Sequence, residues 1–264
     1  MRIAGAPISW GVCEVPGWGY QLPPARVAAE MRELGLRATE LGPDGFLTAE
    51  VLEEHGLRGI GAFVPVVLHD PSFDPIPSLL AQPGVEVLVL AAATGMDGYD
   101  ARPDLDARGW ETLLRNLDRA MDLDRMVTLH PHVGTMVENR AEVTRVLDGS
   151  GVALCLDTGH LLIGGTDPLD VDPGRVAHVH LKDVSLPLAE RVRAGELTYT
   201  EAVAQGIYQP LGQGDVDVAG IVSRLDKDGY TGWYVMEQDV VLSDAEDDPM
   251  ENVRHSLAYL ETLA

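Results

Sequence analysis

The chain has 264 residues, 45% of them hydrophobic, and carries a formal net charge of −23 at pH 7. One (β/α)8 barrel takes about 250 residues, so we expect residues 1–264 to form a single domain of this α/β class. A surface this acidic repels phosphate backbones and anionic lipid, which excludes nucleic acid and membranes as expected partners.

Short apolar strands alternate with helical stretches along the whole sequence. The strands are rich in Val, Leu and Ile without polar alternation, which is typical of strands covered on both faces. We expect eight of them, at residues 3–6, 37–40, 59–67, 85–91, 126–130, 153–156, 176–181 and 233–237.

Helical spacing of apolar residues characterises the segments between these strands. Pro23 and Pro24 open the first helix, because proline suits the first helical turn, and Gly35 ends it. Strands that alternate with helices indicate a parallel sheet, because a parallel crossover needs a helix. Eight such units predict a closed TIM barrel. The alternative is an open doubly wound sheet, but no GxGxxG or GxxxxGK[ST] loop follows any strand.

The two cysteines, Cys13 and Cys155, are too few for a disulfide framework. Cys155 lies in an apolar run and is expected to be a small core residue. The first residues lack the pattern of a signal peptide, and no run approaches the roughly 18 apolar residues of a membrane span. We therefore expect a cytoplasmic location.

Carboxylates and imidazoles gather where the predicted strands end. In a barrel these ends lie on one rim, where barrel active sites are found. Such side chains are costly to bury unless they are paired or bind a metal, so their joint placement predicts a functional site. The residues at these positions are Glu40, His69, Asp70, His130, His132, Asp157, His160, His178, His180, Lys182, Asp183, Glu237 and Asp239.

Three of these residues form a candidate metal site. Asp157, His180 and Glu237 follow different strands and are expected to converge. Carboxylates with an imidazole suit Mn²⁺, Co²⁺, Mg²⁺ or Zn²⁺, and the absence of thiolates argues against a closed structural zinc site. We expect His178 to point to the other face of its strand from His180, as a packed or surface residue. Glu40 either binds substrate or accepts hydrogen bonds from the loop backbone.

Motifs along the whole chain resemble those of the xylose-isomerase-like superfamily of sugar isomerases, epimerases and dehydratases. Within it, the sequence is most similar to the inosose (2-keto-myo-inositol) dehydratases of inositol catabolism. The stretch 91–110 and the connection 122–125 are shorter than in those enzymes, and they border the substrate pocket, which leaves the exact substrate open. The matching motifs are APISWGVCEVPGWGYQLPP, TELGPDGF, GAFVPVVLHDP, HPHVGTMVE, CLDTGH, HVHLKDV, PLGQGDVD and GWYVMEQD.

The resemblance implies a divalent metal held by two glutamates, an aspartate and a histidine. Asp157, His180 and Glu237 match three of these ligands. Many relatives carry the remaining glutamate on the fifth strand, where this chain has no glutamate. Glu138 is our candidate for it, with His132 as the fallback ligand.

The resemblance further implies dehydration of a keto-cyclitol or keto-sugar through an enediolate held on the metal. We expect His132 or His160 to act as the base, or Glu138 if it is not a ligand. His130 is expected to act as the acid for the leaving hydroxyl, and Lys182 to bind a hydroxyl or the enolate. Further substrate contacts are expected from Trp10, Glu40, His69 and Asp183.

The same residues also allow other interpretations. Trp10 belongs to an aromatic loop that either closes over a sugar ring or packs against the barrel top or a neighbouring subunit. The same site also suits a ketose isomerase or epimerase. A non-catalytic sugar-binding protein would not need Asp157, His180 and Glu237 together, and an endonuclease of the abasic-site type is disfavoured by the net charge of −23. Homo-oligomers are common in the superfamily, so the resemblance allows one here.

Overall fold

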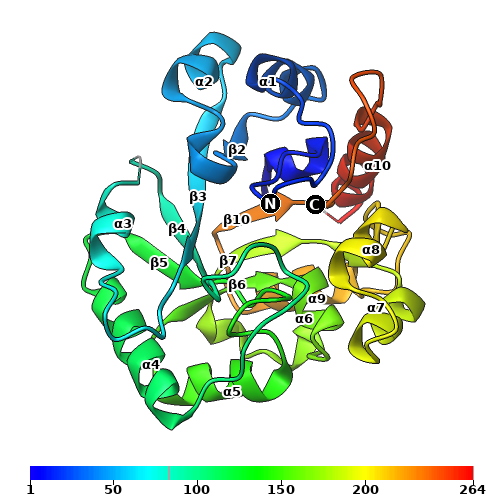
Figure 1. Ribbon diagram of the computed structural model, residues 1–264. Helices are drawn as coiled ribbons and strands as arrows, with labels where there is room; N and C mark the ends of the chain where they lie inside the picture. The colour runs from blue at the N-terminus through cyan, green and yellow to red at the C-terminus, as the bar shows by residue number, and fades with distance from the viewer. Residues whose placement is uncertain (83, 264) are drawn as a thin grey trace.

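Eight parallel strands close into a barrel in a computed structural model that describes residues 1–82 and 84–263 (Figure 1). Their order around the barrel is β1-β10-β7-β6-β5-β4-β3-β2, so the first and last strands of the chain pair with each other. The predicted (β/α)8 barrel is therefore confirmed.

All eight predicted strands are present, with ends that differ from the predicted ones by at most two residues. The strand β4 is buried along its whole length, as expected for a strand covered on both faces. The barrel strands are β1 Arg2–Gly5, β2 Ala38–Glu40, β3 Arg58–Val66, β4 Val87–Ala92, β5 Met126–Leu129, β6 Ala153–Asp157, β7 Val176–Leu181 and β10 Trp233–Met236.

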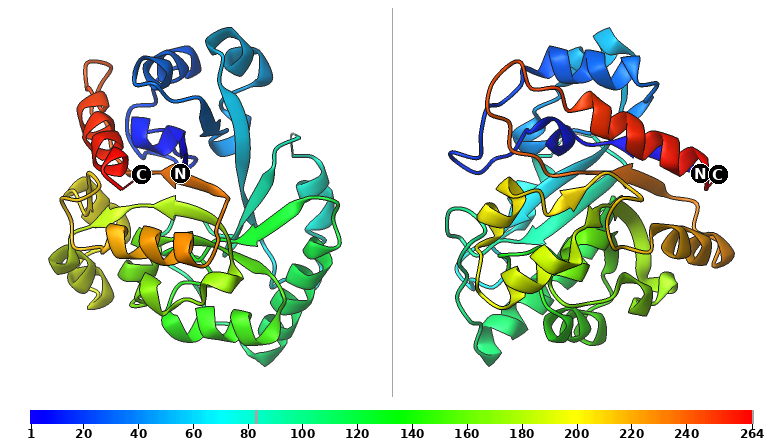
Figure 2. Two further views of the ribbon diagram at one scale, coloured as in Figure 1. Left: turned by 180° about the vertical axis from the view of Figure 1, so that it is seen from behind. Right: turned by 90° about the vertical axis from the view of Figure 1, so that its right-hand side faces the viewer.

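Helices surround the strands, with α10 next to α1 on the outside of the barrel (Figure 2). Their inner faces bury apolar side chains such as Leu113 and Leu117 of α4, which are fully buried against the barrel. In the part of the chain that the structure describes, no helix has the length and apolarity to cross a membrane. The helices are α1 Pro24–Glu33, α2 Ala49–His55, α3 Ile76–Leu80, α4 Ala107–Met121, α5 Arg140–Gly149, α6 Thr158–Ile163, α7 Leu186–Arg193, α8 Tyr199–Ala204, α9 Val218–Lys227 and α10 Met250–Glu261.

One segment departs from the simple alternation of strand and helix. After β7, the chain forms the short strand β8 Asp183–Val184, the helices α7 and α8, and the strand β9 Tyr208–Gln209. The strands β8 and β9 pair antiparallel outside the barrel. This excursion places Tyr199 and Tyr208 next to the carboxyl ends of the barrel strands, where they contact the cluster described below.

Candidate metal centre and active site

A cavity opens at the carboxyl ends of the barrel strands. Polar residues line one part of it, most of them from β2, β7 and the segments after β5, β7 and β10, and aromatic, aliphatic and small residues line the rest. The polar lining residues are Glu14, Glu40, His130, His132, His180, Lys182, Glu237 and Asp239, and the aromatic ones are Trp18, Phe63, Tyr99 and Tyr199.

Asp157, His180 and Glu237 converge, and His180 and Glu237 line this cavity. One ligand atom from each lies within 4.8 Å of the others, and all three residues are buried. His180 Nδ1 lies 3.1 Å from Glu237 Oε2 and 3.6 Å from Asp157 Oδ2. Neither contact has hydrogen-bond geometry, so Nδ1 has no hydrogen-bond partner among the described residues. A buried nitrogen of this kind, facing two carboxylate oxygens, fits a divalent cation.

The local fold fixes the orientation of Asp157. This residue ends β6 and is also the N-cap of α6, because its Oδ1 accepts a hydrogen bond from the backbone N–H of His160 at 2.8 Å. The other oxygen, Oδ2, lies 3.1 Å from His130 Nε2. One carboxylate therefore caps a helix with one oxygen and faces the site with the other.

Glu40 fixes the orientation of His180 from across the barrel. Its Oε1 accepts hydrogen bonds from His178 Nε2 at 2.7 Å and from His180 Nε2 at 2.9 Å. A neutral His180 ring that donates through Nε2 has an unprotonated Nδ1, the nitrogen that faces the carboxylates. Glu40 lines the cavity, but its Oε1 is already bonded to both rings. The expectation that His178 points to the other face is wrong, because side chains two residues apart on a strand share a face.

The charges of this group shift its pKa values. Burial alone raises the pKa of Glu40, but the charge of His180 and the hydrogen bond from His178 outweigh it, and the net shift is downward. Burial alone lowers the pKa of His180, but Cys155, Glu237 and Glu40 raise it well above its ordinary value. Without a metal, the site therefore favours an ionised Glu40 beside a protonated His180.

The structure places Glu138 away from this group. Its Oε2 accepts a hydrogen bond from the backbone of Gly134 at 2.8 Å and pairs with Arg102 Nε at 3.3 Å. These contacts hold the loop after β5 and contradict the assignment of Glu138 as a ligand. His130 occupies the position directly after β5, with its ring centroid 4.9 Å from that of His180. The fallback ligand His132 lies in the cavity but outside the converging set.

A second set of polar groups adjoins the candidate metal ligands. The rings of His132 and His160 stack with centroids 3.7 Å apart. Lys182 Nζ lies 3.1 Å from His160 Nε2, 2.7 Å from Asp239 Oδ1 and 3.2 Å from Glu237 Oε2. The ammonium group of Lys182 therefore sits between an imidazole and two carboxylates.

The two stacked histidines are neutral near pH 7. Burial, with the charges of His130 and Lys182, lowers the pKa of His132 well below its ordinary value. Burial, His132 and Lys182 do the same for His160. His132 Nδ1 lies 2.7 Å from the carbonyl oxygen of Val133, which can only accept. The proton of the neutral His132 ring is therefore on Nδ1, and Nε2 is free to accept one.

Two further polar residues of this set, Tyr199 and Tyr208, were missed in the sequence. Tyr199 Oη donates to Asp239 Oδ2 at 2.9 Å, and Tyr208 Oη lies 3.0 Å from Tyr199 Oη. Asp239 lies two residues after Glu237 and was already among the residues expected at the strand ends. The tyrosines lie in the excursion between β7 and α9, where neither spacing nor motif pointed to the site.

Three expected substrate contacts lie outside the cavity. Trp10 is fully buried in the core, and its Nε1 donates to Glu30 Oε2 at 2.8 Å, which agrees with the packing alternative. Trp18, from the same loop, lines the cavity in its place. His69 is partly exposed and is absent from the cavity lining.

Asp183 anchors a loop instead of facing the cavity. Its two oxygens accept hydrogen bonds from the backbone N–H groups of Val184, Gly212, Gly214 and Val216, at 2.8–3.0 Å. The side chain is fully buried, so these bonds leave no room for a substrate. Asp183 thus ties the β8–β9 excursion to the segment that leads into α9.

We expect Asp183→Ala to destabilise the fold by at least about 3 kcal/mol, because each buried N–H left without a partner costs about 1–3 kcal/mol. Urea unfolding followed by circular dichroism measures the loss. Asp183→Asn, which keeps one accepting oxygen, should lose less. An alanine variant with wild-type stability but weaker substrate binding would restore the substrate-contact assignment.

Comparison with known proteins shows the family of the chain. The family model described as xylose isomerase-like TIM barrel matches residues 20–263, and the chain belongs to this family. The rhizopine catabolism protein MocC of Rhizobium meliloti is 32% identical over 286 residues, covering 98% of this chain and 85% of that protein. An inosose dehydratase of Geobacillus kaustophilus is 32% identical over 288 residues, covering 98% and 91%.

A solved structure shares the fold at lower identity. The crystal structure of the IolI protein with a bound zinc atom superposes with a TM-score of 0.66 at 13% identity, covering 100% of this chain and 98% of that one. At this identity the likeness shows the fold alone.

Proposed function

We propose that this protein is a metal-dependent dehydratase that removes water from a keto-cyclitol or keto-sugar. The observation that carries the proposal is the convergence of Asp157, His180 and Glu237 around an unpartnered ring nitrogen, beside two neutral histidines. The inosose dehydratase that is 32% identical over nearly the whole chain supports the substrate class.

Asp157, His180 and Glu237 would hold the metal, with His130 next to them in the position after β5. Their oxygens and nitrogen suit Mn²⁺, Co²⁺, Mg²⁺ or Zn²⁺. The zinc reported in the IolI structure supports a divalent ion in this fold. When bound, the ion supplies Lewis acidity that favours loss of a proton from the carbon next to a carbonyl.

The proton transfers fall to residues of the cavity wall. His132 Nε2, unprotonated in the neutral ring, takes the proton from the carbon next to the carbonyl and then delivers it to the β-hydroxyl that leaves as water. Lys182, held positive by Asp239 and Glu237, stabilises the negative oxygen of the enolate. His160 keeps the Lys182 ammonium group in place. The acid role moves from His130 to His132, because His130 Nε2 is bonded to Asp157.

A mass measurement in D₂O tests the proposal. The Mn²⁺-loaded protein is incubated with 2-keto-myo-inositol and the product mass is followed. Loss of one water is the expected result. Deuterium incorporation without water loss would instead assign the protein as an isomerase or epimerase, because both reactions begin with the same proton removal. Neither change, on this substrate and on a panel of ketoses, would contradict both activities.

The pH profile tests the assignment of His132 as the base. The base acts in its neutral form, and the pKa of His132 lies below its ordinary value of about 6.5. Activity therefore rises with pH through this lowered pKa, and we expect the acidic limb of kcat/KM, at saturating metal, to lie below pH of about 6.5. We expect His132→Gln to lower the rate by about 10²–10⁴-fold. An unchanged profile in that variant would exclude His132 as the base.

A further inference from the structure

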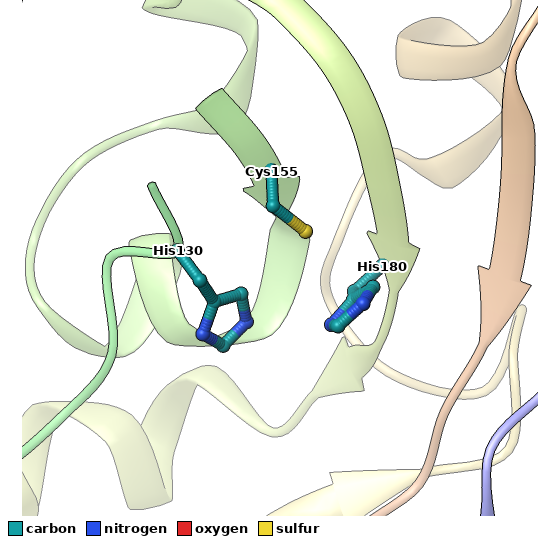
Figure 3. Close-up of side chains that lie close together, drawn as sticks. All are labelled: His130, Cys155 and His180. Carbon is teal, nitrogen blue, oxygen red and sulfur yellow. The ribbon is translucent and has the colours of Figure 1, made fainter. Parts of the chain in front are cut away.

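Cys155 lies directly beneath the proposed metal centre. It is on β6, two residues before Asp157, so both side chains point into the barrel. The thiol is fully buried and is absent from the lining of the cavity above. Figure 3 shows the sulfur pointing into the space between the rings of His130 and His180. Packing alone would be served by any small apolar residue at this position.

The three side chains of Figure 3 are close enough to share an ion. One ligand atom each from His130, Cys155 and His180 lies within 4.8 Å of the other two. Both imidazoles are buried, at 2% exposure, and each has an Nδ1 without a hydrogen-bond partner among the residues described. Two histidine nitrogens and one sulfur form a ligand set that soft or borderline ions prefer to carboxylate oxygens.

We propose that His130, Cys155 and His180 form a second, inner metal position that takes thiophilic divalent ions such as Cd²⁺. The inference rests on the proposed function, because the inner set shares His180 with the outer set of Asp157, His180 and Glu237. His180 Nε2 is bonded to Glu40, which leaves Nδ1 to serve either set, and one nitrogen cannot bind two ions, so the two positions exclude each other. The thiol proton is released to solvent when the ion binds.

The inner position gives the centre a defined ion preference. Ions that favour oxygen, such as Mn²⁺ and Mg²⁺, occupy the outer set. A thiophilic ion held by Cys155 lies deeper and removes His180 from the outer set. We therefore expect thiophilic ions to inhibit an enzyme that Mn²⁺ activates, and this inhibition to depend on Cys155.

Cobalt spectroscopy tests the assignment without relying on activity. The metal-free protein is titrated with Co²⁺, which gives visible ligand-field bands with any ligands and a near-ultraviolet sulfur-to-cobalt band only with a thiolate. Cys13→Ser is the matched control, because it leaves Cys155 as the only cysteine of the chain. We expect the sulfur band in the wild type and in Cys13→Ser. We expect Cys155→Ser to lose it and to keep the visible bands.

Each outcome has a separate meaning. Visible bands without the sulfur band in Cys13→Ser overturn the inner position. They leave the proposed metal enzyme intact, because this variant changes no residue of the barrel strands. Absence of all cobalt bands contradicts the proposed function as well. As a second readout, competition against Mn²⁺ should show Cd²⁺ affinity falling at least about tenfold in Cys155→Ser. An equal Cd²⁺ affinity in wild type and Cys155→Ser also overturns the proposal.

Discussion

We expect Glu237→Gln to lower turnover by at least about 10²–10³-fold, because Lewis-acid catalysis supplies several kcal/mol and each 1.4 kcal/mol corresponds to a factor of about ten. The amide removes the negative charge that faces His180 Nδ1 at 3.1 Å and keeps nearly the same volume. The affinity for Mn²⁺, measured by isothermal titration calorimetry, should fall together with turnover.

The control is Glu53→Gln, an exposed carboxylate on α2 far from the rim. It makes the same chemical change and should leave both turnover and Mn²⁺ binding at wild-type values. A Glu237→Gln variant that binds no metal and still turns over substrate would exclude Glu237 as a ligand and the metal as a participant in the reaction.

The second large effect concerns the buried cation. Lys182→Met keeps the length of the side chain but removes the charge that lies 2.7 Å from Asp239 and 3.2 Å from Glu237. Removing one partner of a buried charge pair costs about 3–5 kcal/mol, because the remaining carboxylates lose their counter-charge. We expect this loss in the metal-free protein, measured by urea unfolding, together with a large fall in kcat.

Metal binding separates the two roles of Lys182. A divalent ion restores positive charge beside Glu237, so added Mn²⁺ should recover part of the stability of Lys182→Met but not its activity. The chain has only one other lysine, Lys227, which is exposed on α9 and serves as the matched control for the same substitution. Equal activity in Lys182→Met and Lys227→Met would exclude Lys182 from the chemistry.

The strands and the core of the site were predictable from the sequence for one physical reason. A strand buried on both faces must be apolar, so the polar residue at its end stands out, as with Asp157 at the end of β6 and Glu237 directly after β10. Barrel closure then brings all such ends to one rim. Neither step needs a long-range contact to be known in advance.

The residues whose positions were wrongly predicted lie in or next to loops, and the path of a loop depends on contacts that the sequence pattern does not reveal. Glu138 follows the β5 motif closely, but its chain turns back and pairs it with Arg102. Asp183 looks like a rim carboxylate, yet it bonds backbone groups some thirty residues later in the chain. Trp10 lies in a short 3-10 helix that turns it into the core. Sequence distance alone does not reveal these turns.

The carboxylate of Glu40 also has a consequence for how the protein reaches its native state. Its partners on β7, His178 and His180, lie 138 and 140 residues further along the chain. Contacts of such separation form slowly, because a long loop must close before they stabilise anything. A half-folded chain therefore lacks an oriented His180. A metal ion that needs this ring binds only molecules in which the barrel has closed. Rising metal concentration should therefore slow unfolding while leaving the early steps of refolding unchanged.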